Sequence, residues 1–341
     1  MIPDSLIADP PPLPLLVTGL TGVSGYNAFE YFRSRFPGQV VAIRQTSNWP
    51  LSGPGIVPCN AEDPVGLKRL FDEYQFKAVL NCAGNCALKS CELDPNMAYR
   101  INLSGVRNLL DVVGERDLRF IHVSIDLVFS GRGQGGHFES DRTDPVTVYG
   151  SSMAAAEHLV QLVRPNATIM RISLPMGISY SGHAGAIDWI QARFKADKPA
   201  TLYYDEVRTP TYTDCLNRVF HYFLNRDLPG LYHSGGPLRL SLYQIAQIVN
   251  RVGGYDPDLL QGCYRVEAGP MPPRAGNVTL DSTKLADVIG VAPFDVWPYH
   301  PWQVPTDRRW HYDRPSDQQH SPEHLAAVLY QNPASESSHA S

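Results

Sequence analysis

The stretch VTGLTGVSGYNAFEYF, residues 17–32, joins the end of an apolar run to a segment with helical spacing through three glycines. In the turn of a dinucleotide-binding fold, a first glycine permits a tight bend, a second lets the backbone approach a pyrophosphate, and a third lets helix and strand pack closely. Gly19, Gly22 and Gly25 have the spacing for these tasks. Unpaired N–H groups at the start of the following helix attract negative charge, so we expect a pyrophosphate there.

Further apolar runs follow this stretch and alternate with segments of helical spacing, such as residues 26–36 and 97–115. Short, continuous apolar runs between helices are typical of buried parallel strands. The expected strands are LPLLVTG (13–19), QVVAIR (39–44), KAVLNCAG (77–84), LRFIHVS (118–124) and ATIMRIS (167–173). This alternation predicts an α/β fold, a doubly wound parallel sheet.

The pattern changes after about residue 173, where Pro and Gly become more frequent and helices more widely separated. We therefore expect a dinucleotide-binding domain over residues 13–172 and a smaller substrate lobe over residues 173–300, with short returns to the first domain. Residues 301–341 are rich in Pro, polar and aromatic residues. We expect their aromatic part to strap onto the body and the final stretch to be disordered.

Composition excludes several classes of protein. The chain has 341 residues, 43% hydrophobic and 18% charged, which is enough to bury a large core. The net charge is −5, and no Lys/Arg run is interleaved with aromatics, which argues against a nucleic-acid partner. No apolar run reaches the roughly 20 residues that span a bilayer, and the start of the chain has no basic segment ahead of its apolar part. We expect a cytoplasmic protein without a membrane partner.

The six cysteines could form three disulfides or a metal cluster. Cys82, Cys86 and Cys91 lack the paired C-x-x-C spacing of zinc sites, and they straddle the end of an apolar run in which side chains alternate direction. Free thiols and no metal site are the expected outcome.

The end of the second expected strand bears on the choice of dinucleotide. NAD-binding folds usually place Asp or Glu there to bind the ribose 2′-hydroxyl, whereas a cation accommodates a 2′-phosphate. The run VVAIRQTSN has Arg44 at this place. NADP(H) is therefore favoured, with a solvated surface arginine as the alternative.

Several motifs together resemble a known family. The glycine turn, NCAGNCALKSCE, INLSGVRNLL, HVSIDLVFSG, VYGSSMAAAE, DEVRTPTYTD, GLYHSGG and PPRAGNVTLDSTKL occur in the order found in extended short-chain dehydrogenases/reductases. The chain is most similar to the dTDP-4-dehydrorhamnose reductase-like sugar-nucleotide group, over roughly residues 13 to 290. The resemblance implies a Rossmann-type lobe that holds NADP(H) and a C-terminal lobe that holds a nucleotide-linked keto sugar.

The resemblance also implies roles for individual residues. Asn81 to Gly84 look like the floor under the adenosine, and Asn102 looks like the asparagine that braces the sheet near the catalytic tyrosine; a strand end and a helix start would explain the same residue types. The expected cofactor-binding residues are Gly19, Thr21, Gly22, Val23, Gly25, Arg44, Asn81, Cys82, Ala83, Gly84, Asn102 and Met153.

The catalytic motifs depart from the family. Its Ser/Thr, Tyr and Lys cooperate in reduction, and here Tyr149 is retained while Ile125 stands for the threonine, Leu127 for a second tyrosine and Met153 for the lysine. Ser124 is adjacent and is the remaining hydroxyl candidate, although it should point to the other side of the strand. Losing an organised acid/base group costs roughly 100- to 10,000-fold in rate. We predict Tyr149 and Ser124 as the catalytic residues of a slow site, with the family glutamate retained as Glu157.

The substrate motifs are mixed. Leu174 replaces the tryptophan that would cover the sugar, so a rhamnose-type hexose is not favoured. An arginine can bind a diphosphate with two hydrogen bonds, and Arg274 is the candidate, with a structural arginine as the alternative. The expected substrate-binding residues are Asp126, Arg208, Thr209, Arg274 and Asn277.

Two hypotheses stay open. One is an NADP(H)-dependent oxidoreductase acting on a nucleotide-linked keto sugar with an atypical site, which the retained motifs favour slightly. The other is a binding or regulatory protein that kept the fold and its dinucleotide but lost the chemistry. A third variant has Lys89 swing into the place left by the lysine. The sequence leaves a monomer and a homodimer open.

Overall fold

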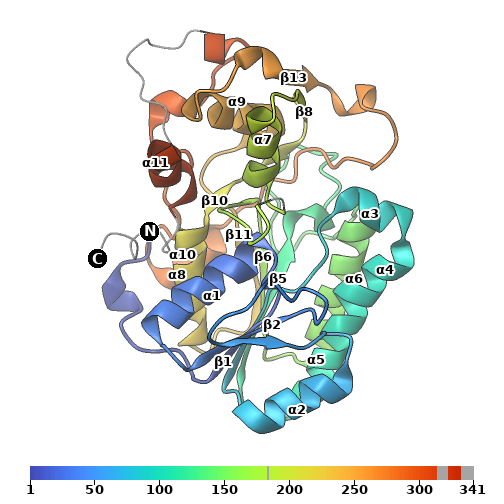
Figure 1. Ribbon diagram of the computed structural model, residues 1–341, viewed down its shortest axis with the longest axis vertical. Helices are drawn as coiled ribbons and strands as arrows, with labels where there is room; N and C mark the ends of the chain where they lie inside the picture. The colour runs from blue at the N-terminus through green and yellow to red at the C-terminus, as the bar shows by residue number, and fades with distance from the viewer. Residues whose placement is uncertain (183, 313–321, 332–341) are drawn as a thin grey trace.

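The computed structural model describes residues 1–182, 184–312 and 322–331. Its centre is a seven-stranded, all-parallel sheet in the order β11-β6-β5-β4-β1-β2-β3 (Figure 1). The strands are β1 (Leu15–Val17), β2 (Val40–Arg44), β3 (Ile56–Pro58), β4 (Ala78–Asn81), β5 (Arg119–Ile125), β6 (Thr168–Ile172) and β11 (Gly230–Ser234). The order β3-β2-β1-β4-β5-β6 is that of a doubly wound dinucleotide-binding sheet, so the predicted fold class is confirmed.

The five expected runs form β1, β2, β4, β5 and β6. Two strands of the seven-stranded sheet, β3 and β11, were not expected. β3 is only three residues long and partly exposed, so it lacks the apolar signal of a buried strand. β11 pairs with β6 at the far edge, with Leu231 opposite Ile169, although some sixty positions separate them. A strand that joins the sheet from the later part of the chain cannot be placed by local pattern alone.

Two layers of helices cover the sheet (Figure 1). On one face lie α1 (Val23–Arg35) and α8 (Thr213–Leu224), and on the other α2 (Pro64–Tyr74), α5 (Gly105–Val113) and α6 (Val148–Val163). Alternation along β1 serves both layers, because Leu15 and Val17 belong to one buried cluster while Leu16 belongs to the other. Coverage of both faces explains why the strands read as continuous apolar runs.

A smaller set of elements stands at the carboxyl end of the sheet (Figure 1). Three two-stranded pairs are formed by β7 (Pro175–Met176) with β10 (Thr211–Tyr212), β9 (Val207–Arg208) with β12 (Leu240–Ser241), and β8 (Ala200–Tyr203) with β13 (Leu260–Cys263). Helices α7 (Ala186–Lys195) and α9 (Leu242–Val252) pack beside them, and α9 begins at a capping box between Ser241 and Gln244. Ligands of doubly wound folds bind beyond this end of the strands.

The remaining helices lie at the periphery. α3 (Leu88–Leu93) and α4 (Pro95–Tyr99) follow β4, α10 (Thr283–Ile289) lies beside β11, and α11 is Pro322–Leu325. Residues 301–312 lie against α9, where the Tyr243 hydroxyl donates to the Arg308 carbonyl at 3.1 Å. The tail expected to be disordered falls largely on 313–321 and 332–341, outside the described residues. Within the described ranges, no helix has the length and apolarity needed to cross a bilayer.

Candidate functional site

The glycine turn between β1 and α1 gives each glycine a different environment. A Cβ on Gly19, whose φ is +72°, would lie 2.1 Å from the Cys82 carbonyl oxygen, and a Cβ on Gly25 would lie 2.3 Å from the Gly19 oxygen. A Cβ on Gly22 would meet only the Gly19 oxygen, at 3.5 Å, and otherwise points into open space. Close packing thus requires the first and third glycines, whereas the space at Gly22 is free for a ligand.

The start of α1 suits an anionic group. The helix begins at Val23, and no side chain of the described residues caps it at Gly22. Its first backbone N–H groups and its dipole are therefore available to a negative charge. Thr21 is exposed beside them. These residues could hold the pyrophosphate of a dinucleotide.

Arg44 ends β2, next to the glycine turn on β1. Its guanidinium donates to the carbonyls of Gln45 at 3.0 Å and Thr46 at 3.1 Å, and the side chain is partly exposed. The cation therefore lies folded against its own loop at the edge where a ribose 2′-substituent is expected.

Asn81, at the end of β4, is a buried junction of three strands. Its Oδ1 accepts from the Thr18 hydroxyl at 2.6 Å, and its Nδ2 lies 3.0 Å from His122 Nδ1 on β5. The Ala83 backbone N–H donates to the Thr18 hydroxyl at 3.2 Å. These bonds hold residues 81–84 against the glycine turn, at the place predicted for the adenosine floor. Burial raises the pKa of the Cys82 thiol, so it stays protonated.

Asn102 connects the loop that follows β4 to α6. It lies in a π-helical turn, Arg100–Ser104. Its Oδ1 accepts from the Asn85 N–H at 2.6 Å, and its Nδ2 donates to the Ser152 hydroxyl at 2.8 Å. A Cβ on Gly84 would touch Asn102 Oδ1 at 3.5 Å and the Met153 sulfur at 3.7 Å. The loop after β4 and the helix that carries Met153 are therefore in contact.

Tyr149 lies in the first turn of α6, which Thr147 caps through a 2.9 Å bond from the Gly150 N–H. Glu92 of α3 accepts from the Val148 N–H at 2.7 Å, so this end of the helix is held from two sides. The tyrosine is 7% exposed and belongs to the same buried cluster as Ile125, Leu127 and Met153. Burial foremost, and then the nearby Cys86 and Asp126, raise the pKa of Tyr149 well above its ordinary value. The phenol is a proton donor that resists ionisation.

Ser124, predicted as a catalytic hydroxyl, has its hydroxyl engaged by another side chain. Its hydroxyl donates to Glu157, which lies eight residues beyond Tyr149 on α6. The Glu157 carboxylate also accepts two bonds from Arg171 on β6, at 2.9 and 2.7 Å. Strand alternation turns Ile125, not Ser124, toward the cluster of Tyr149. Ser124 thus serves the packing of α6 on the sheet.

Asp126 and Arg208, both predicted to bind substrate, bind each other. The Arg208 guanidinium donates from Nε and Nη2 to the two carboxylate oxygens of Asp126, and the side chains are 4% and 0% exposed. The Ser173 hydroxyl donates to the same carboxylate and accepts from the Thr209 N–H at 3.1 Å. Sequence reasoning missed Glu206, a buried carboxylate 3.6 Å from the Arg208 guanidinium. Glu206 is only two positions from Arg208 in the chain, whereas the pair of Arg208 with Asp126 spans 82 positions and leaves no spacing signal.

Arg274 keeps part of its surface free. Its guanidinium lies 4.8 Å from the centre of the Tyr203 ring and 3.8 Å from Glu206, and its side chain is 25% exposed. Its part in binding a diphosphate stays a prediction, and its contacts with Glu206 and Tyr203 fit the structural alternative as well.

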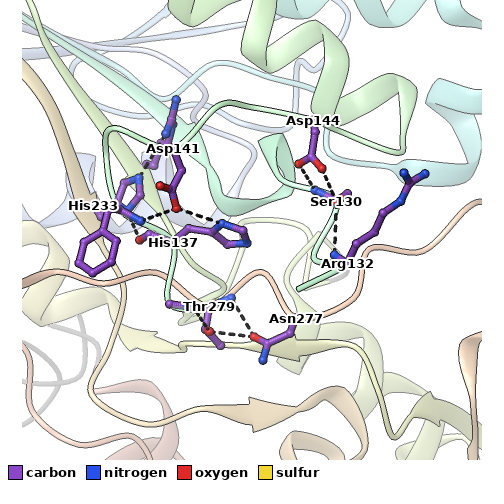
Figure 2. A network of polar contacts seen from close by, with 11 residues as sticks. Ser130, Arg132, His137, Asp141, Asp144, His233, Asn277 and Thr279 are labelled. Atoms are coloured by element: carbon purple, nitrogen blue, oxygen red, sulfur yellow. Dashed lines mark hydrogen bonds and ion pairs between the residues drawn. The ribbon is translucent and has the colours of Figure 1, made fainter. Parts of the chain in front are cut away.

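Asn277 is engaged in holding a loop (Figure 2). Its Oδ1 accepts from the Thr279 hydroxyl at 2.8 Å, and its Nδ2 donates to the Gln134 carbonyl at 2.8 Å. The loop begins at Ser130, whose N–H donates to Asp144 at 2.8 Å. Figure 2 shows Asp144 above Ser130 and Asn277 beside Thr279. The side chain predicted to touch substrate is thus occupied by the loop that follows β5.

All six cysteines are free thiols. In the described part of the chain, no three His, Cys, Asp or Glu side chains are arranged as ligands of a metal ion.

Comparison with known proteins places these observations in a family. Residues 13–299 match the family model described as the RmlD substrate binding domain. The probable low-salt glycan biosynthesis reductase Agl14 of Haloferax volcanii is 26% identical over 276 residues, which are 80% of this chain and 91% of that protein. The methionine adenosyltransferase 2 subunit beta of Xenopus laevis is 24% identical over 320 residues, which are 86% and 89% of the two chains.

A solved structure shares the fold. The dTDP-4-dehydrorhamnose reductase of Bacillus anthracis, in complex with NADP, aligns with a TM-score of 0.68 at 18% identity and covers 83% of this chain and 95% of its own. Together with the family match over residues 13–299, the strand order and the glycine turn, this confirms the predicted resemblance: the chain belongs to the RmlD substrate-binding-domain family of extended short-chain dehydrogenases/reductases.

Proposed function

We propose that the protein is an NADP(H)-dependent reductase of a nucleotide-linked keto sugar, with an atypical active site. The observation that carries the proposal is the position of Tyr149, in the first turn of α6 and beside the loop that follows β4. The relative from Haloferax volcanii is named a reductase of glycan biosynthesis. The structural neighbour from Bacillus anthracis is named a dTDP-4-dehydrorhamnose reductase and holds NADP.

We assign each task of such a reaction to different residues of this chain. NADP(H), when bound, supplies the hydride. The first turn of α1 and the open space at Gly22 suit its pyrophosphate, and Arg44 suits its 2′-phosphate. Tyr149 holds the proton for the carbonyl oxygen, and its raised pKa makes the phenol a weaker acid, which fits a slow site. Arg274 suits the diphosphate of the sugar nucleotide.

The opposite hypothesis, a protein that binds the dinucleotide without turnover, also has support. Met153 and Ile125 are buried, at 3% and 9% exposure, and neither can supply the charge or the hydroxyl of the family site. The relative from Xenopus laevis is named as a subunit of a methionine adenosyltransferase, and the alignment covers 86% of this chain. The two hypotheses differ in whether Tyr149 transfers a proton.

Turnover and its restoration distinguish the hypotheses. We expect slow oxidation of NADPH with nucleotide-linked 4-keto sugars, a roughly 100- to 10,000-fold loss in Tyr149→Phe, and a gain in the double variant Met153→Lys/Ile125→Thr. A lysine at the buried position 153 should lower Tm, so folding is checked by circular dichroism. A silent wild type that the double change activates would support binding without turnover. Unchanged turnover in Tyr149→Phe would exclude the proposed mechanism.

Dinucleotide preference is tested separately, by calorimetry without substrate. Arg44→Asp should weaken NADPH binding and strengthen NADH binding, because a carboxylate accepts from the 2′-hydroxyl and repels a 2′-phosphate. Arg33→Asp is the matched control, because Arg33 is paired with Glu30 on the surface of α1. An Arg44→Asp protein that still prefers NADPH would show that another group selects the 2′-phosphate.

A further inference from the structure

The loop formed by residues 264–274 leaves the second lobe directly after β13 and ends at Arg274 (Figure 1). Val266 and Met271 on it are 89% and 52% exposed. Three of its residues are prolines, which have no backbone N–H to donate. Within the described ranges, residues 269–273 make no hydrogen bond to the rest of the chain. The backbone that reaches Arg274 is therefore held only at the two ends of the loop.

The beginning of the loop is fixed from two sides. β13 pairs with β8 along its whole length, which brings the start of the loop beside Asp205. The Asp205 carboxylate accepts from the Arg265 backbone N–H at 2.9 Å and lies 3.1 Å from Arg265 Nε. Arg308, from the segment that lies against α9, donates to the Tyr264 hydroxyl at 2.7 Å. Arg265 thus has an anchored backbone and a paired charge.

The Arg265 side chain reaches the other end of the loop. Its Nη1 donates to the Arg274 carbonyl at 3.0 Å. A Cβ on Gly276 would lie 3.1 Å from Arg265 Nη2, so the guanidinium lies along the backbone of residues 274–276. A hydrogen bond from a charged donor is stronger than one from a neutral donor. One arginine therefore connects Asp205 to the backbone that carries the Arg274 side chain.

The direction of the Arg274 side chain depends on that backbone. In the described structure its guanidinium donates no hydrogen bond; it lies 4.8 Å from the centre of the Tyr203 ring and 3.8 Å from the Glu206 carboxylate. An arginine that binds a diphosphate with two hydrogen bonds must be held at a defined angle, because its donors form a planar fork. A ring face and a carboxylate beyond hydrogen-bond distance constrain this angle weakly, so the backbone largely sets it.

We propose that Arg265 is a positioning residue of the nucleotide-diphosphate site: it fixes the backbone at Arg274 and so directs the Arg274 guanidinium toward the ligand. This inference rests on the proposed function, in which Arg274 binds the diphosphate of the sugar nucleotide. Arg265 acts through Arg274 and makes no contact with the ligand. Removing Arg265 should therefore weaken ligand binding only while Arg274 is present.

The test is a double-mutant cycle measured by calorimetry, with dTDP as the probe and no turnover required. Arg265→Gln should weaken dTDP binding about five- to tenfold, and Arg274→Gln about tenfold or more. The double variant should bind dTDP as Arg274→Gln does, within about twofold, because a residue that acts only through another has no effect once the other is removed. NADPH affinity should be the same in all four proteins.

Two further variants complete the design. Arg193→Gln is the matched control, because Arg193 also closes a short loop of the second lobe, donating from Nε to the Pro199 carbonyl at 2.9 Å. It should leave dTDP affinity unchanged. Asp205→Asn removes the charge that orients Arg265, so it should weaken dTDP binding and lose this effect beside Arg274→Gln. If Arg265→Gln does not fold, as judged by circular dichroism, the cycle with Asp205→Asn decides.

Three results would overturn the inference. Losses that multiply in the double variant would mean that Arg265 contacts the ligand itself or acts on the whole fold. An unchanged dTDP affinity in Arg265→Gln, with the loss in Arg274→Gln intact, would remove Arg265 from the site and leave the proposed function in place. A wild-type protein that binds NADPH but not dTDP would reject the proposed diphosphate site, and the inference with it.

Discussion

Gly22 and its two neighbours show how one residue type serves different purposes within a single turn. A Cβ on Gly19 or Gly25 would lie only 2.1 or 2.3 Å from a backbone oxygen, so both positions require glycine. Gly22 has extended backbone angles, and the position of its Cβ is open. Substitution of Gly22 therefore separates ligand binding from folding, and substitution of Gly25 does not.

Gly22→Ala should leave folding nearly intact and weaken the dinucleotide. Alanine is a poorer N-cap than glycine, so we expect the free energy of unfolding to fall by less than about 1 kcal/mol. The added methyl group occupies the space of the pyrophosphate, and NADPH affinity should drop at least about tenfold, or 1.4 kcal/mol. Calorimetry measures the affinity and urea denaturation the stability. Gly133→Ala, where a Cβ meets nothing within 4 Å, is the control; equal affinities in the two variants would contradict a pyrophosphate at this turn.

Helix α6 is fastened to the sheet by a buried ion pair between Glu157 and Arg171, with side chains 4% and 5% exposed. The same carboxylate accepts from Ser124, and Arg171 Nη1 lies 3.2 Å from His233 Nε2 on β11. One helix is thus joined to three neighbouring strands, β5, β6 and β11, through a continuous polar network. This network orients the helix whose first turn carries Tyr149.

Glu157→Gln should destabilise the whole fold. Removing one partner of a buried pair leaves the other charge uncompensated, which costs roughly 3–5 kcal/mol. Asp111→Asn is the matched control, because its pair with Arg107 spans 4.0 Å between side chains 66% and 73% exposed and contributes little. Urea denaturation of both variants at pH 7 gives the comparison. Equal stabilities would mean that the amide fully replaces the carboxylate in the network.

The whole molecule should lose stability in mild acid through two buried histidines. Burial lowers the pKa of His122 and of His233 to about 4, from an ordinary value near 6.5. Below pH 6.5 these histidines become protonated in the unfolded chain, whereas in the folded chain they stay neutral until about pH 4. Each histidine therefore destabilises the fold by up to roughly 3 kcal/mol as the pH falls through this window, and has no such effect above it.

Two carboxyl groups act in the opposite direction. Burial raises the pKa of Asp126 and Glu206, so the folded chain binds their protons more readily and gains stability as the pH falls. His122→Gln isolates the histidine contribution. Urea denaturation at pH 7 and pH 5 should show a smaller loss in this variant than in the wild type, and equal losses would mean that His122 is not neutral in the folded state.

Much of the fold could be predicted because its signals are local. Five buried strands give continuous apolar runs, since both faces of the sheet are covered, and the glycine turn follows from the geometry of one bend. The family motifs were equally readable, and Met153 and Ile125 stand where the resemblance implies a lysine and a threonine.

What the chain order could not reveal were contacts between segments distant in sequence. β11 joins β6 across some sixty positions, and Arg208 closes on Asp126 across 82. Residue types at Asp126 and Arg208 were compatible both with substrate contacts and with an ion pair. Only tertiary packing decided between a substrate contact and an ion pair. A buried charge pairs with whichever opposite charge the folded backbone brings within a few ångströms of it. That distance has no counterpart in sequence spacing.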